Sequence, residues 1–172
     1  MKTGLVRAYL FSLITFFILN FLITIISYSI VGLLIDLELP RYSTHPVFVF
    51  FRLIYPMLFF PWDLLILGAN QALIGFMVFY FGFFISLIVA SVVAGLMGGD
   101  IVKSVGGWIL TSITCILVFI IIALIDSIVL AFVCFSCTFE EVMVQVIIHG
   151  LINILLFGVL TAFIAMLKGR SS

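Results

Sequence analysis

Asp126 is the residue with the clearest chemical potential, because it is an acid inside an apolar stretch of membrane-span length. A carboxylate in hydrocarbon is costly unless it is paired, so such residues usually face the bundle interior. The last two long apolar stretches are joined near Cys137. Asp126 lies eleven residues before that point and His149 twelve after it, so helices rising about 1.5 Å per residue place them at similar depth. The sequence therefore predicts an Asp126–His149 pair that responds to protonation.

Further polar residues are expected at the same site. Gln145, His149 and Asn153 are spaced by four and share one face of a helix. Asn20 lies about midway along the first apolar stretch, at the expected depth of Asn153. Together with Asp126 they predict a polar interior. This interior is either a set of interhelical hydrogen bonds or a functional site, which would be a proton path or a polar ligand pocket.

A second kind of chemistry is suggested by the cysteines. Cys134 and Cys137 form a CxxC motif, a spacing that permits a redox disulfide. Cys115 is nineteen residues before Cys134, about 28 Å along a helix, and cannot join that pair. The chain has no phosphate-binding loop, no zinc-type cysteine spacing and no metalloprotease motif. We therefore predict no metal and no cofactor outside the redox alternative.

The position of this CxxC gives a resemblance to a known family. The chain has a CxxC motif just before its last membrane helix and a half-buried segment that covers the bundle after the first helix. This layout resembles that of vitamin K epoxide reductase. The resemblance implies that Cys134 and Cys137 exchange electrons with a quinone. In that family a second cysteine pair in the first outer loop relays electrons, and residues 36–70 of this chain contain no cysteine.

Composition restricts the class of protein that can hold these residues. Of the 172 residues, 66% are hydrophobic and 8% charged, with a mean hydropathy of +1.54. A soluble domain could not cover that much apolar surface, whereas a lipid bilayer accepts it. Seven basic and seven acidic residues cancel, which argues against a nucleic-acid partner. We predict one multi-pass membrane domain over residues 1–172, located in the cell membrane.

Four apolar stretches are long enough to span a bilayer as helices, which takes about 20 residues. They cover approximately residues 6–35, 71–97, 106–133 and 142–167. A fifth apolar segment, 47–67, carries Arg52 and is interrupted by Pro56 and Pro61, which break a straight helix. The predicted fold is therefore an all-α bundle of four transmembrane helices with an interfacial or re-entrant segment after the first.

The basic residues favour four spans over five. With four spans, one side of the membrane receives Lys2, Arg7, Lys103, Lys168 and Arg170. With five, the two basic chain ends would be separated. Basic residues collect on the cytoplasmic side, so both termini are predicted to be cytoplasmic.

Small residues mark a packing face on the second span. They recur every four residues, as Gly82, Ser86, Ala90, Ala94 and Gly98. Such rows allow close helix contact in a membrane. The next helix opens with Gly106 and Gly107 after a short turn, so it is the expected partner. The contact is either internal or a seam between subunits.

The leading functional hypothesis is a small non-enzymatic membrane protein. It would be an accessory subunit of a membrane complex or a minimal bundle that handles solutes or protons through its polar interior. One alternative is a membrane thiol–disulfide oxidoreductase that uses Cys134 and Cys137. Another is a structural bundle that forms homo-oligomers through its small-residue faces.

Overall fold

The computed structural model describes residues 2–33, 39–133 and 137–170. Every regular element in these ranges is helical. Four helices are long and apolar enough to cross a membrane: α1 (Lys2–Val31), α5 (Ile74–Met97), α6 (Ile101–Ile125) and α8 (Phe139–Arg170). Each overlaps one predicted span, so the prediction of an all-helical chain with four span-length apolar helices is confirmed.

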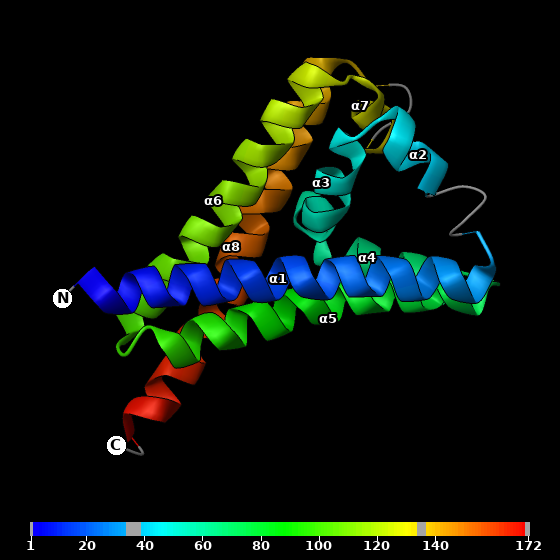
Figure 1. Ribbon diagram of the computed structural model, residues 1–172. Coiled ribbons are helices and arrows are strands. Elements are labelled where there is room, and N and C mark those ends of the chain that lie inside the picture. The colour runs from blue at the N-terminus through cyan, green and yellow to red at the C-terminus, as the bar shows by residue number, and fades with distance from the viewer. Residues whose placement is uncertain (1, 34–38, 134–136, 171–172) are drawn as a thin grey trace.

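The long helices form two antiparallel pairs that cross near one end and spread apart toward the other (Figure 1). In the first pair, Ser12 Oγ on α1 donates a hydrogen bond of 3.0 Å to the carbonyl oxygen of Ala90 on α5. In the second pair, Gly150 on α8 lies against the side chain of Ile116 on α6. Both chain ends lie toward the crossing end, near the turn between α5 and α6 (Figure 1).

A short segment that folds back on itself fills the space between the diverging pairs (Figure 1). It consists of α3 (Val47–Ile54), the 3-10 helix η2 (Tyr55–Leu58) and α4 (Pro61–Ala69), and α2 (Leu39–Thr44) precedes it. We call residues 47–69 the hairpin, because α3–η2 and α4 meet at an angle of 101°. Six of its apolar side chains are fully buried in the core: Phe48, Phe51, Ile54, Met57, Leu58 and Leu64.

The third predicted span differs from the observed helix at both ends. It was expected to run from 106 to 133, but α6 begins at Ile101 because Asp100 caps it by accepting the N–H of Lys103 over 2.8 Å. α6 ends at Ile125, and a separate helix, α7 (Ile128–Val133), follows. Asp126 is extended, and its Oδ1 accepts the N–H of Ile128 over 3.1 Å, which starts the new helix. Asp126 therefore lies just beyond the end of the long apolar helix, not within it.

The small residues of α5 pack mainly on α1. Gly82 lies against Ile23, and Ala90 accepts the hydrogen bond from Ser12. At the other end of the row, the carbonyl oxygen of Gly98 lies beside Gly4. Ser86, Ala90, Ala94 and Gly98 are buried.

The expectation that α6 is the main partner of this row is wrong. α6 meets the row at Gly98, beside Ser104, and its own Gly107 packs on Ala8 and Tyr9 of α1. The glycine-rich start of α6 and the small face of α5 thus both approach α1.

Candidate functional site

The bend in the hairpin leaves backbone carbonyl groups without helical partners. Proline has no N–H, so Pro61 cannot donate to the carbonyl of Met57, four residues earlier. Pro56 likewise cannot donate to the carbonyl of Leu53, three residues earlier. Phe59 is extended, which takes its carbonyl out of the helical pattern. Each of these carbonyls needs another donor if it is buried away from water.

Polar side chains from α1 and α8 supply these donors. Asn153 Nδ2 donates to the carbonyl oxygens of Met57 over 3.2 Å and Phe59 over 3.1 Å. Asn20 Nδ2 donates to the carbonyl oxygen of Leu53 over 2.7 Å. His149 Nδ1 lies 2.9 Å from the carbonyl oxygen of Leu58 and so carries the proton of this bond. Three of the predicted polar residues therefore meet on one stretch of backbone, residues 53–59.

Some acceptor atoms at this site have no partner among the described residues. They are Asn20 Oδ1 and Asn153 Oδ1, and Ser27 Oγ on the same helix as Asn20 is also unpaired. The three side chains are at most 1% exposed. A buried acceptor without a donor costs about 1–3 kcal/mol. The amide nitrogens are thus committed to the backbone, while the amide oxygens remain open to a donor.

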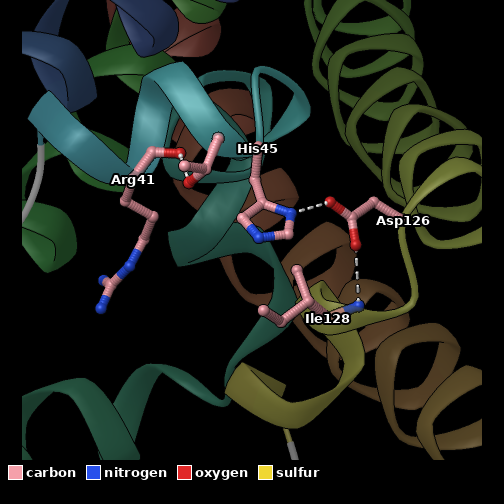
Figure 2. Close-up of polar contacts among 5 residues, drawn as sticks. Arg41, His45, Asp126 and Ile128 are labelled. Atoms are coloured by element: carbon pink, nitrogen blue, oxygen red, sulfur yellow. Dashed lines mark hydrogen bonds and ion pairs between the residues drawn. The ribbon is translucent and has the colours of Figure 1, made fainter.

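Asp126 does not pair with His149, so that prediction is wrong. Its partner is His45, which lies between α2 and α3, with His45 Nδ1 and Asp126 Oδ2 2.5 Å apart (Figure 2). The predicted pairing assumed that α6 continues as one helix to residue 133. Because α6 ends at Ile125, Asp126 instead lies in a turn, where it reaches His45.

Three forces set the charge state of Asp126. Partial burial acts to raise the pKa of this carboxyl group. The hydrogen bonds from His45 and from the N–H of Ile128, together with the charge of His45, outweigh that effect, so the pKa lies below its ordinary value. Asp126 is therefore a carboxylate over most of the pH range.

The remaining predicted residues lie away from the polar interior. Gln145 is half-buried, and its Nε2 lies 4.0 Å from Cys137 Sγ. Cys137 is disulfide-bonded, whereas Cys134 lies outside the described residues. Cys115 is buried and free. The structure thus separates the sulfur chemistry from the residues that hold the hairpin.

Sequence reasoning did not identify Arg52 as part of the interior. Its side chain is 5% exposed, and its Nη2 donates to the hydroxyl oxygen of Tyr28 over 2.6 Å. The guanidinium carbon lies 4.9–5.7 Å from the centres of four aromatic rings: Tyr28, Phe48, Tyr55 and Phe79. Contacts of this kind stabilise a buried cation. Phe48 and Tyr55, four residues before and three after Arg52, were the available signal.

Open grooves lie on the outer surface of the helices, and two of them are strongly apolar. One, of about 460 Å³, runs along α5 and is lined by Ile74, Met77, Val78, Phe81, Gly82 and Ile85. The other, of about 300 Å³, lies between α4, α5 and α8 beside Trp62. Both are lined almost entirely by apolar side chains.

The described part of the chain offers little for metal chemistry, since no three histidine, cysteine or acidic side chains cluster within 2–33, 39–133 and 137–170. His45 and Asp126 are a pair only. No protein-family model, curated protein or solved structure matches the chain.

Proposed function

We propose that this chain is a multi-pass membrane protein that acts as a non-enzymatic accessory subunit of a membrane complex. The proposal rests on one observation: the interior polar side chains spend their hydrogen-bond donors on the protein's own backbone. The side-chain donors of Asn20, His149 and Asn153 all go to the hairpin backbone. Groups engaged in this way stabilise a fold and are not free to bind and release a substrate.

The outer surface supports the same role. Large apolar side chains are exposed along every long helix, among them Ile18 on α1, Ile85 on α5 and Val159 on α8. Lipid accepts such a surface, and so does another membrane helix. The groove along α5 is part of that apolar surface.

The proposed orientation places both termini in the cytoplasm and brings the hairpin into the membrane from the opposite side. Arg7, Lys103, Lys168 and Arg170 belong to the helix ends that lie near one another in Figure 1. Their gathering on one side supports the positive-inside argument. Cys137 lies beyond the other end of α6, and its disulfide favours an oxidising compartment there.

Topology reporters test this orientation. Fusions at the N-terminus and C-terminus are both expected to give the cytoplasmic signal, because an even number of spans returns the chain to its starting side. A third reporter inserted after Asn70, between α4 and α5, should give the opposite signal. Signals on opposite sides from the two chain ends would contradict the four-span proposal and favour a hairpin that crosses the membrane.

Site-directed photocrosslinking in the native membrane tests the accessory role. Probes at Ile18, Ile85 and Val159 sample three faces of the bundle. A subunit docks on one face, so we expect one position to yield a protein adduct of a single mass while the others yield lipid adducts. An adduct with a second copy of the chain would support the structural homo-oligomer instead. Lipid adducts at all three positions would overturn the proposal.

A second candidate is the solute- or proton-handling bundle. It is favoured by the unpaired amide oxygens of Asn20 and Asn153, which are acceptors buried at the hairpin bend, and by the buried unpaired hydroxyl of Ser27 further along α1. Proton or cation flux in vesicles that contain only this chain would support this candidate over the accessory subunit. The thiol–disulfide alternative with a quinone remains a prediction.

A further inference from the structure

We propose that His45 and Asp126 form a pH-sensitive latch between the hairpin and the turn that joins α6 to α7. The latch holds the entrance of the hairpin, by which we mean the junction of α2 and α3, against that turn. The contact joins residues 81 positions apart in the chain, and Figure 2 shows the imidazole ring of His45 directed at the carboxyl group of Asp126. It links the side chains of two short turns, each of which separates a pair of helices.

Both ends of the latch are fixed by backbone hydrogen bonds. The N–H of His45 donates to the carbonyl of Arg41 over 2.8 Å, and the carbonyl of His45 accepts the N–H of Phe48 over 2.9 Å. Asp126 uses its other oxygen, Oδ1, to accept the N–H of Ile128. A change at either side chain is therefore transmitted to the start of α3 or the start of α7.

The latch can exchange protons with water. The side chains of His45 and Asp126 are 34% and 22% exposed, whereas Asn20 and Asn153, which hold the hairpin bend, are fully buried. The entrance of the hairpin is thus held to the long helices by groups that water can protonate, whereas the bend is held by groups that water does not reach. Opening the latch should release α2 and the start of α3 and leave the bend in place.

The charged groups on the neighbouring elements do not take over this contact. On α2, the Arg41 guanidinium lies over the ring of Phe48 and points away from His45 in Figure 2. On α3, Arg52 is buried beside Tyr28. α7 has no ionisable residue, and the last turn of α6 before Asp126 has none.

The first turn of α8 carries two further acidic groups, Glu140 and Glu141. Both are exposed, and the Glu141 carboxylate accepts hydrogen bonds from Thr138. Neither glutamate has a described bond to His45.

The sign of the pH dependence follows from Asp126. A carboxyl group whose pKa is lowered in the folded state stabilises that state above its ordinary pKa, about 3.9 for aspartic acid, and this stabilisation is lost as the pH falls through the lowered value. When the imidazole ring is protonated, the contact becomes an ion pair. The latch is therefore closed at neutral and mildly acidic pH and opens in stronger acid.

Pulsed electron–electron resonance on the full chain in nanodiscs tests the latch. Spin labels at Phe50 on α3 and Ile121 on α6, both exposed, report the distance across it in a Cys115→Ala background. The parent is expected to give one narrow distribution at pH 7.5 and 5.5 and a broader one at pH 2. Labels at Ile14 and Ile85, on α1 and α5, should give the same distribution at all three values.

Substitutions at His45 and Asp126 test whether the broadening in acid comes from the latch. Asp126→Asn and His45→Ala should each give the broad distribution already at pH 5.5 with no further change at pH 2, and the double variant should be no broader than either single one. Asp63→Asn, a matched change of an acid on α4, should behave as the parent. A parent distribution that does not change with pH, or a transition that persists in Asp126→Asn, would overturn the proposal. If Asp126→Asn fails to assemble, His45→Ala decides between the same outcomes.

Discussion

Replacing Asn153 by leucine is expected to lower the free energy of unfolding by about 2–6 kcal/mol, because two buried carbonyl groups lose their donor at about 1–3 kcal/mol each. The carbonyl of Met57 has no helical substitute, since Pro61 stands where its donor would be. The carbonyl of Phe59 belongs to an extended residue and is equally dependent on Asn153. Unfolding in mixed detergent micelles gives the energy, and hydrogen exchange of the hairpin locates the loss.

A matched control lies two turns further along the same helix. Thr161 is also fully buried, and its single hydroxyl proton is shared between two backbone carbonyl oxygens, those of Ser91 and Phe157. Both carbonyls are within continuous helices and already have helical partners. Thr161→Val should therefore cost only about 0.6 kcal/mol, the average for interhelical hydrogen bonds in membranes. Equal losses in the two variants would show that the prolines do not make the hairpin depend on Asn153.

The long helices could be predicted because their physical cause is local. A stretch of about 20 apolar residues in lipid must pair its backbone N–H and C=O groups with one another, and a helix does so. The end of α6 could not be predicted in this way. Residues 126–133 are as apolar as the helix before them apart from Asp126 and Ser127, and the helix stops where Asp126 is engaged by His45, far away in sequence.

Three residues of the polar interior were predicted, but the groups that they bond were not. Asn20, His149 and Asn153 stand out because polar side chains are rare in apolar helices. Their partners are main-chain carbonyls, which no pattern of side chains displays directly. Pro56 and Pro61 did carry the information, because each proline removes one donor and leaves a carbonyl that another group must satisfy.

The partner of the small-residue row could have been found in the sequence. α1 has a row of its own with the same spacing of four, formed by Gly4, Ala8 and Ser12. Two rows of small residues fit each other better than either fits large side chains. The short turn between α5 and α6 suggested the other pairing, but chain proximity brings only the ends of two helices together.

Gly107→Ala is expected to destabilise the bundle by about 1–3 kcal/mol, the usual cost of overpacking a filled interface. A methyl group at position 107 would lie 2.4 Å from Ala8 Cβ and 2.8 Å from the backbone nitrogen of Tyr9. The second contact is with main chain, so α1 and α6 must move apart. That movement would also weaken the bond of 3.1 Å between Tyr9 Oη and Thr114 Oγ1.

Gly158→Ala is the control for this substitution. Gly158 is also buried in a long helix, but the nearest atom to an added methyl group is Trp108 Cδ1, at 3.9 Å. Both changes gain helix propensity, up to about 1 kcal/mol for glycine to alanine. Unfolding of the two variants in detergent should thus give a loss for Gly107→Ala and no loss for Gly158→Ala. Adding Ala8→Gly to Gly107→Ala removes the nearest clash and should recover part of the stability, whereas no recovery would mean that α1 does not pack on α6 at this point.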